Sequence, residues 1–519
     1  MTSTPHPFLA LYRSFSLLAV LLLVQACTSV PFDYPREPST SLAATTDTRL
    51  GAFANSWSVQ NGQQSGFLSL PDGIGALGAR LKLIEAAQQS IDAQYFILKK
   101  DRVGALFTGK LLRAADRGVR VRLLIDDIFS PGLDSPLTLL NTHPQIEVRL
   151  FNPVSRNSLR YWGMLLDFKR ANRRMHNKSF TVDGSMSIVG GRNIGEEYFE
   201  LKQSVKFDDY EILTVGPAVT EISAGFDAYW NSELAVPIEA FGRKVKPQEL
   251  NDWRELVLRD VASAENGIYG PAVNSRKIKA VTDEEEEFVA ANATVVIDTP
   301  AKLTGAVGDA TLATLAVDVG KRFRQAQSEI VIITPYFIPQ ETGAQLLADI
   351  VAKGVRVVVV TNSLASTNHI PVHSRYTKYR RQLLGKGVEF YEIRVDRAEQ
   401  ESEWGFNPER ITLHSKASMI DKETIFVGSL NFDPRSLLLN TEMGLFVESP
   451  ILGRQFSNSL NTELHKTAYR VALNADGKTR WYWEPEDDEH EMYTSEPQAS
   501  VGRRIMTNLY KLVPIEGQL

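Results

Sequence analysis

The fold of this 519-residue chain is decided by the stretch HNKSFTVD at residues 176–183, which is followed by GGRN at residues 190–193. The chain repeats the pattern once, as HSKASMID at residues 414–421 and GSLN at residues 428–431. The alternation predicts a strand that carries a His and a Lys, two apart, on one face. A single His-x-Lys pair is weak evidence, but two complete copies with equal trailing spacing indicate a site.

The repeat extends beyond these motifs. AQYFI at residues 93–97 recurs as TPYFI at 334–338, and GVRV at 118–121 recurs at 354–357. The offsets are 241 and 236 residues, against 238 for the motif itself, so the copies run nearly in register. Three anchors at nearly one spacing indicate an internal duplication.

Helical and strand-like patterns alternate ahead of the first motif. Residues 76–89 and 104–117 have a helical period, whereas 91–98 and 119–126 are strand-like. Such alternation predicts an α/β fold, with a mostly parallel or mixed sheet covered by helices.

The composition is that of a globular protein, with 43% hydrophobic and 23% charged residues. A net charge of −5 gives no overall attraction to nucleic acid. The expected division is a signal peptide (1–26), a tether (27–70), a first half (71–235), a linker (236–300), a second half (301–470) and a C-terminal tail (471–519). The tail is expected to dock either on the body of the protein or on a membrane surface.

The N-terminus has the pattern of a processed segment. Arg13 precedes the apolar run at residues 17–24, which is too short to span a bilayer but suits the core of a signal peptide. Cys27, the only cysteine of the chain, follows directly. Its position resembles the lipidation site of bacterial lipoproteins, and the alternative is an ordinary signal peptide with an incidental cysteine. A lone cysteine excludes an intramolecular disulfide.

The repeated residue types suit phosphodiester chemistry. A phosphodiester repels nucleophiles, and an imidazole nucleophile such as His176 or His414 divides the displacement into two easier steps. The second histidine protonates the leaving oxygen and then activates the acceptor. Lys178, Lys416 and the two Asn amides are expected to neutralise and orient the phosphate oxygens. The pattern predicts neither a metal nor another cofactor, because the sequence has no His/Cys ligand cluster.

Each histidine also needs a carboxylate that fixes its tautomer. Glu442 lies eleven residues after Asn431 and just before an apolar strand. Its counterpart in the first half is predicted to be Asp209. Both are expected to support the site.

These motifs resemble the signature of the phospholipase D superfamily, over about residues 70–470. The resemblance implies two homologous α/β halves in a pseudo-two-fold arrangement, with one active site between them. Carried over to this chain, it implies catalytic roles for His176, Lys178, Asp183, His414, Lys416 and Asp421, with the two Asp residues partly structural. It implies substrate binding by Asn193, Ser429 and Asn431.

A closer resemblance is to bacterial cardiolipin synthases of the C type. The segments that carry it are RRMHNKSF at residues 173–180, GGRNIG at 190–195, TNSLA at 361–365 and NFDPRS at 431–436. It implies transfer of a phosphatidyl group between phospholipids such as phosphatidylglycerol and phosphatidylethanolamine. The lipidation-site pattern at Cys27, which is not expected in every member of that family, implies a lipoprotein anchored in the bacterial envelope and facing the periplasm. The alternatives are a phospholipase D hydrolase that releases phosphatidic acid, a nuclease, and an inactive lipoprotein scaffold.

Two further features have competing interpretations. Residues 159–170 mix aromatic, aliphatic and basic residues, which is typical of a segment at a lipid interface or of a core helix with a basic end. His373, with four cations nearby, is a candidate for a headgroup pocket. The alternative places those cations on a solvated helix face.

Overall fold

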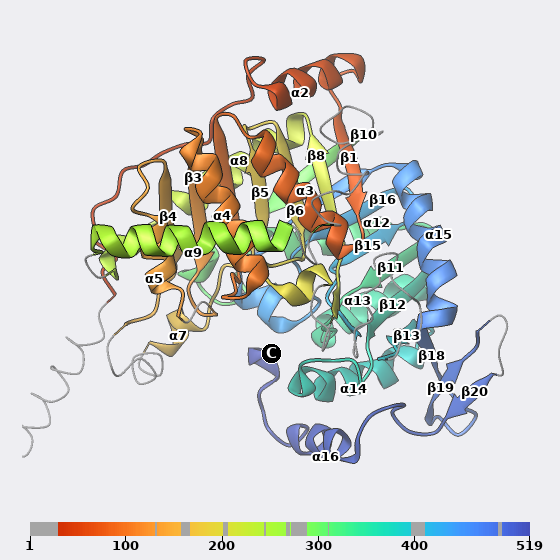
Figure 1. Cartoon of the computed structure of the whole chain (residues 1–519). Helices are drawn as coiled ribbons and strands as arrows, with labels where there is room; N and C mark the ends of the chain where they lie inside the picture. The colour runs from red at the N-terminus through yellow and green to blue at the C-terminus, as the bar shows by residue number, and fades with distance from the viewer. Residues whose placement is uncertain are drawn as a thin grey trace, which may run out of the picture.

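The computed structural model describes residues 30–129, 132–156, 167–200, 206–242, 245–265, 270, 288–309, 311–395, 411–485 and 490–519. Within these ranges the strands pair into one 18-stranded mixed sheet with helices on both sides (Figure 1). The sheet consists of two half-sheets that repeat the same strand order. The predicted α/β fold with two homologous halves is therefore confirmed.

The first half-sheet has the order β9-β4-β3-β2-β5-β6-β8-β1. Strands β2, β3 and β4 are parallel, and the other pairings are antiparallel. The strands are β1 (Ser65–Leu70), β2 (Ser90–Tyr95), β3 (Arg120–Asp126), β4 (Ile146–Phe151), β5 (Ser179–Val182), β6 (Met186–Gly190), β8 (Glu211–Val215) and β9 (Ala235–Pro237).

The second half-sheet continues as β10-β17-β16-β15-β11-β12-β13-β18-β19-β20. Antiparallel pairing of β1 with β10 joins the two half-sheets. The strands are β10 (Val289–Ile297), β11 (Glu329–Ile333), β12 (Arg356–Asn362), β13 (Glu389–Ile393), β15 (Ala417–Ile420), β16 (Thr424–Gly428), β17 (Met443–Glu448), β18 (Ala468–Leu473), β19 (Thr479–Trp483) and β20 (Glu491–Tyr493). A separate parallel pair, β7 (Lys206–Asp208) with β14 (Ile411–Leu413), also links the halves.

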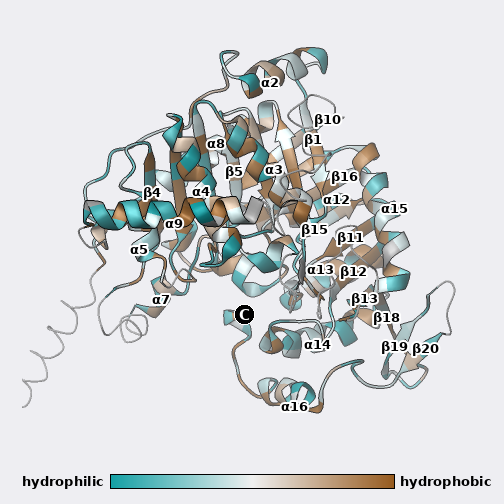
Figure 2. Ribbon diagram, viewed as in Figure 1, coloured by the Kyte–Doolittle hydropathy of each residue, from teal (hydrophilic) through white to brown (hydrophobic). Residues whose placement is uncertain are grey.

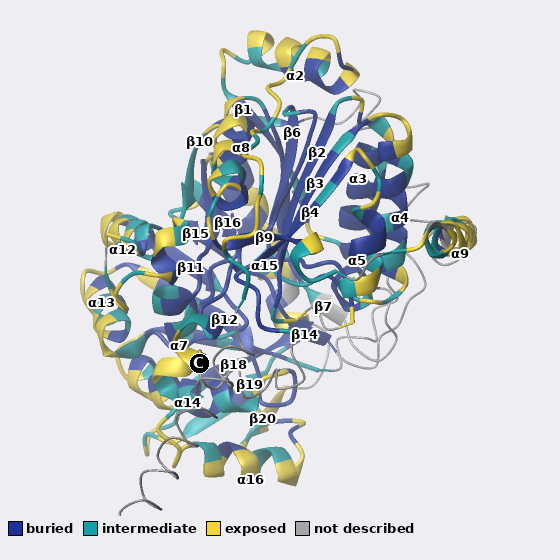
Figure 3. Ribbon diagram, turned by 90° about the vertical axis from the view of Figure 1, so that its left-hand side faces the viewer, coloured by how far each residue is buried: buried dark blue, intermediate teal, exposed yellow. Residues whose placement is uncertain are grey.

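Helices cover both faces of each half-sheet, so the central strands are buried throughout (Figure 3). In the first half α3 (Gly73–Ala86) and α4 (Arg102–Asp116) share a core with Val121 and Leu123, whereas α8 (Pro217–Trp230) packs on Leu124, on the opposite face. The other helices of the two halves are α5 (Asp134–Leu140), α7 (Phe168–Ala171), α9 (Pro247–Glu265), α12 (Thr314–Gln325), α13 (Gln340–Ala352), α14 (Ile370–Leu384) and α15 (Pro450–Thr467).

A further core lies between the halves. It brings Val189 of β6 and Ile212 of β8 together with Val427 of β16 and Leu445 of β17. Burial of apolar surface from both halves in one cluster holds them together. The motif segments lie beside this cluster, so the packing of the halves determines how the two motifs meet.

The predicted elements of the first half are confirmed within four residues. The helices expected at 76–89 and 104–117 are α3 and α4, and the strands expected at 91–98 and 119–126 are β2 and β3. The expectation that each motif His and Lys lies within a strand was wrong. Strands β5 and β15 begin only after Lys178 and Lys416, because the preceding segments pair with the other half of the protein.

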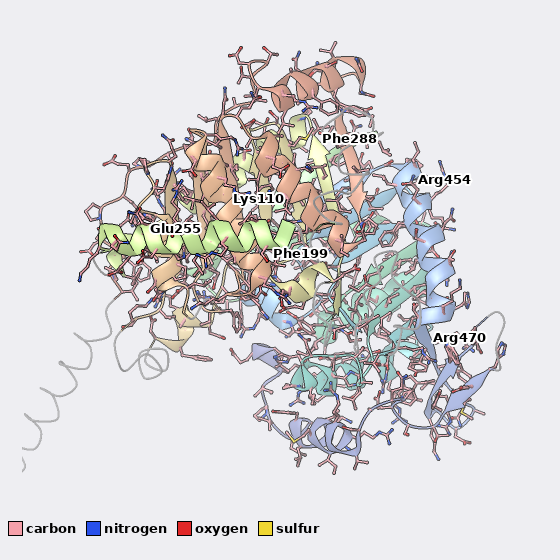
Figure 4. The ribbon with its side chains drawn as sticks, in the orientation of Figure 1. Lys110, Phe199, Glu255, Phe288, Arg454 and Arg470 are labelled. Carbon is pink, nitrogen blue, oxygen red and sulfur yellow. The ribbon has the colours of Figure 1, made fainter. Side chains whose placement is uncertain are left out.

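The regions predicted as a tether (27–70) and a linker (236–300) contain more structure than expected. The first contains β1 and a helix, α2 (Arg49–Gln60), and the second contains α9 and β10. Phe288, labelled in Figure 4, lies 5.6 Å from Trp57 of α2, measured between ring centroids. These elements depend on contacts with distant residues, which a local sequence pattern does not reveal.

One repeat anchor was also out of register. Val182 and Ile420 occupy equivalent positions in the two motif strands. Val182 pairs with Ile91 in the first half, and Ile420 pairs with Ile330 in the second. Ile91 and Ile330 are therefore equivalent, so the offset of this strand is 239 residues and not 241. The similar letters of YFI at 95–97 and 336–338 thus do not occupy equivalent positions.

In the part of the chain that the structure describes, no helix combines the length and apolar character that crossing a bilayer requires. The predicted signal peptide and Cys27 lie outside the described residues, as does most of the segment 159–170.

Candidate active site

Each motif histidine is held by the backbone of the opposite half. The His176 amide donates to the carbonyl of Thr441 at 2.9 Å, and the His414 amide donates to the carbonyl of Asp208 at 2.7 Å. The first contact extends an isolated bridge at Met175, and the second extends the pairing of β14 with β7. The two motifs are thereby fixed at the interface between the halves.

The side chains cross the same interface. His176 Nδ1 lies 2.8 Å from Oε2 of Glu442, and His414 Nδ1 lies 2.5 Å from Oδ2 of Asp209. Each histidine therefore pairs with the carboxylate of the other half. When Nδ1 carries the proton and donates to the carboxylate, Nε2 presents its lone pair on the other side of the ring.

The two carboxylates have different supports. The Ser429 hydroxyl donates to Oε2 of Glu442. The equivalent position in the first half is Gly191, where an added Cβ would lie 2.2 Å from Oδ1 of Asp209. Ser429 was predicted to bind substrate, and in the structure its hydroxyl contacts the Glu442 carboxylate; substrate binding by this residue stays a prediction.

The two motif lysines are buried, and each donates to the carbonyl of its own histidine. The Lys178 ammonium lies 2.6 Å from the carbonyl oxygen of His176, and Lys416 makes the equivalent contact with His414. Burial lowers the pKa of Lys178 to about 7 and that of Lys416 to about 8. A nearby anion would favour the charged form of both lysines and oppose this shift.

Both histidines are neutral at pH 7. Burial lowers the pKa of His176 to about 4, against the opposing effect of Glu442. Burial also lowers the pKa of His414, with further lowering by the charges of Lys416 and Lys178. A neutral imidazole has the lone pair that nucleophilic attack requires.

A cavity of about 580 Å³ contains both histidines, together with Asn193 and Asn431. Oδ1 of Asn193 accepts from the amide of Ile97 at 3.0 Å, which fixes the orientation of the side-chain amide. Oδ1 of Asn431 is buried without a hydrogen-bond partner among the described residues. Much of the remaining wall is apolar and includes Ile97, Ile128, Phe129, Phe168, Val372 and Leu519.

Comparison with known proteins agrees with this geometry. The family model for the cardiolipin synthase, PLD-like domain matches twice, at residues 81–230 and 319–466. Each match contains one His-x-Lys motif, and together they span more than half of the chain. The chain belongs to the phospholipase D superfamily.

Relatives that match most of the chain place it with the phosphatidyltransferases of cardiolipin synthase type. It is 37% identical to cardiolipin synthase C of Escherichia coli (strain K12), over 88% of this chain and 97% of that protein. It is 26% identical to the cardiolipin synthase of Oceanobacillus iheyensis, over 78% of this chain and 70% of that protein. The fold resembles that of phosphatidylserine synthase from Haemophilus influenzae Rd KW20, with a TM-score of 0.55, 13% identity and coverage of 90% of this chain and 100% of that chain.

The motif aspartates of this superfamily member lie away from the cavity. The Asp183 carboxylate accepts from the backbone amides of residues 88–90, and the Asp421 carboxylate accepts from those of residues 327–329. Both residues begin tight turns with positive φ, 50° and 55°. This geometry fits the structural part of the predicted role, because each carboxylate anchors the loop that enters a central strand.

His373 does not line the cavity. It is buried against Tyr376, and its Nε2 lies 3.5 Å from Oε1 of Glu496. Arg380 is also buried, and it pairs with Glu392 and Glu496. The prediction that the cations near His373 lie on a solvated helix face was therefore wrong for Arg380. These contacts tie α14 to the C-terminal tail.

Two aromatic residues of the site were not predicted. Phe96 packs edge-on against His176 at 4.8 Å, and Tyr198 packs edge-on against His414 at 5.3 Å, measured between ring centroids. Such contacts restrict rotation of the imidazole rings. The sequence offered a weak signal for Phe96 alone, in the repeated YFI stretch. Among the described residues, no three His, Cys, Asp or Glu side chains are grouped to hold a metal ion.

Proposed function

We propose that this protein is a cardiolipin synthase that acts at a membrane surface through a phosphohistidine intermediate. The observation that carries the proposal is one cavity with two histidines, each paired at Nδ1 with a carboxylate of the opposite half. The names of the relatives supply the substrate class, and the largely apolar cavity wall suits a lipid.

In the first step Nε2 of one histidine attacks the phosphorus of a donor phospholipid. The bound phosphodiester anion raises the pKa of the second histidine, which takes up a proton from solvent and becomes an imidazolium. An N–P bond then forms, the bond between phosphorus and the headgroup oxygen breaks, and the imidazolium gives its proton to that oxygen. In the second step the same histidine, now neutral, removes the proton from the hydroxyl of phosphatidylglycerol. The resulting oxygen nucleophile attacks phosphorus and releases the first histidine.

Lys178 and Lys416 would stabilise the charge on the non-bridging oxygens during both steps. Their ammonium groups are buried with the histidines, where electrostatic interactions are stronger than in water. Asn193 and Asn431 line the same cavity and would orient the phosphate. The residue that forms the covalent bond is identified by recovering the phosphatidylated peptide, which contains either His176 or His414.

The proposal includes the organisation of the chain. Residues 1–26 would direct export, and Cys27 would carry the lipid that anchors the protein in the bacterial envelope, facing the periplasm. The two halves would comprise residues 71–235 and 301–470, and each gains an edge strand from outside these bounds, β1 for the first half and β10 for the second. Asp183 and Asp421 would stabilise loops, and Ser429 would hold Glu442.

The decisive experiment is lipid mass spectrometry after incubation of the full chain with vesicles of phosphatidylglycerol and phosphatidylethanolamine. We expect cardiolipin from wild type and none from His176→Ala or His414→Ala, because both histidines serve one site. Half of the wild-type activity in either variant would indicate two independent sites. Phosphatidic acid without cardiolipin would indicate a hydrolase instead, and unchanged lipids would reject both lipid activities and lead to tests on nucleic acid.

A further inference from the structure

Helix α16 (Val501–Tyr510) divides its residues between two faces (Figure 2). Arg503 and Thr507 face the body of the protein, where Arg503 donates to the carbonyls of Leu364 at 2.8 Å and Thr367 at 2.5 Å. The Arg375 guanidinium donates to carbonyls at the end of the helix. The helix is therefore firmly docked by one face.

The opposite face is apolar and exposed. It presents Val501, Ile505 and Leu509 of the helix and Leu512 of the turn that follows, with exposed fractions of 69%, 54%, 52% and 81%. Met506 and Val513 widen this face. A cluster of this kind on a docked helix is unusual for a protein surface that meets only water.

The charge around this face has one sign. Residues 497–515 contain three cations and no acidic residue, although the whole chain has a net charge of −5. Arg503 faces the body of the protein, so Arg504 and Lys511 are the cations beside the apolar face. An apolar face flanked by cations is complementary to an anionic lipid surface, which offers acyl chains beneath negative headgroups.

The helix is connected to the active site. After α16 the chain runs back toward the cavity, where the Arg435 amide donates to the Leu519 carbonyl at 2.8 Å and its guanidinium to the Gln518 carbonyl at 3.0 Å. Gln518 and Leu519 line the cavity that contains both histidines.

The cavity has exposed apolar residues of its own. Phe129 and Phe168 line it and are 55% and 52% exposed. Figures 1 and 3 show α7, which begins at Phe168, and α16 toward the same end of the molecule, opposite α2.

We infer that the exposed apolar face formed by α16 and the turn that follows it (Val501, Ile505, Met506, Leu509, Leu512 and Val513) docks on an anionic phospholipid bilayer. In this position the helix brings the cavity to the lipid surface, so that substrate enters from the bilayer. The inference rests on the proposed function for the identity of that substrate, but the docking itself requires no turnover.

The test is hydrogen exchange of the full chain, with and without vesicles of phosphatidylglycerol and phosphatidylethanolamine. We expect amides of residues 501–513 to exchange at least about tenfold more slowly on vesicles, as interfacial burial predicts. Amides of α2 should not change. The readout is local, so it does not depend on whether Cys27 also anchors the chain.

The matched variants are Leu509→Glu/Leu512→Glu and, on the distant helix α2, Val59→Glu, whose side chain is 66% exposed. The first should abolish the protection and lower turnover of vesicle lipid about tenfold, while turnover of the same lipid in detergent micelles is unchanged. The second should behave as wild type. Protection that persists in the double variant would overturn the inference. Protection that appears without vesicles and increases with protein concentration would also overturn it, because it would indicate that a second copy of the chain covers this face. Protection without cardiolipin formation would leave the docking intact and reject the proposed function.

Discussion

Nδ1 of His176 lies 2.8 Å from Oε2 of Glu442, although the two residues are 266 positions apart and belong to different halves. The charge of Glu442 and its hydrogen bond to His176 raise the pKa of the histidine, but burial lowers this pKa by more. The carboxylate therefore acts mainly through geometry, by fixing the ring and its tautomer.

Glu442→Gln is expected to lower kcat by about 10³-fold, since an amide fails to select the tautomer that exposes the Nε2 lone pair. Asp209→Asn should have a similar effect through His414. Ser429→Ala removes one support of Glu442 and should cost only about tenfold. Steady-state kinetics on detergent-dispersed lipid provides the measurement, and equal losses in Glu442→Gln and Ser429→Ala would contradict this reasoning.

Gly191→Ala should lower kcat at least about 100-fold, because its Cβ would displace the Asp209 carboxylate from His414. A suitable control is Gly320→Ala in α12, where the nearest atom to the new Cβ is Nη1 of Arg324 at 3.5 Å. The control should retain wild-type kinetics. Full activity of Gly191→Ala would show that the close approach of Asp209 is unimportant.

With His176 as the nucleophile, the acid limb of kcat/KM should lie near pH 4, because burial lowers the pKa of His176 to about 4. Above that pH the imidazole is neutral and competent for attack, and below it the ring is protonated. Activity on detergent-dispersed lipid should therefore persist at pH 5.5, with circular dichroism to show that the fold is intact. Half-loss near pH 6.5 would contradict the prediction.

Lys178→Met should inactivate the protein and stabilise it. The pKa of Lys178 falls to about 7 on folding, so the unfolded chain binds a proton that the folded chain releases. Stability therefore rises with pH between about 7 and 10.5, and the methionine should add about 1–3 kcal/mol at pH 7 and less at pH 9.5.

Thermal unfolding at both pH values tests this prediction. Lys110→Met is the control. Lys110 is also buried, but its Nζ lies 2.7 Å from Oε1 of Glu85, so the substitution removes an ion pair and should destabilise the protein. A gain for Lys178→Met that is the same at both pH values would exclude the proton-linked explanation.

Chelation by EDTA should leave the rate unchanged, because Lys178 and Lys416 supply the positive charge that a metal ion provides in other phosphodiesterases. The assay compares initial rates before and after dialysis against the chelator. Loss of activity that a divalent ion restores would reject the phosphohistidine route.

The sequence predicted the residue types of the site better than their partners. The motif histidines and lysines were identified because both copies carry them at the same spacing. The crossed pairing of His414 with Asp209 was not predicted, since it depends on how two half-sheets pack and no local pattern encodes that contact.

Errors in the fold had a similar origin. The region around β10 was interpreted as a linker, yet its register is set by β1 and β17, which are distant in the sequence. The repeat around YFI was misaligned by two residues, a shift that keeps every side chain on the same face of the strand and so leaves the hydrophobic pattern unchanged.

The different supports of the two carboxylates have a consequence for symmetry. Two identical subunits would be obliged to place the same residue beside both acids. Because both halves belong to one chain, this protein combines Glu442 and Ser429 on one side with Asp209 and Gly191 on the other. A single polypeptide can thus specialise one histidine for bonding to phosphorus and the other for moving protons, which a symmetric dimer of one sequence cannot encode.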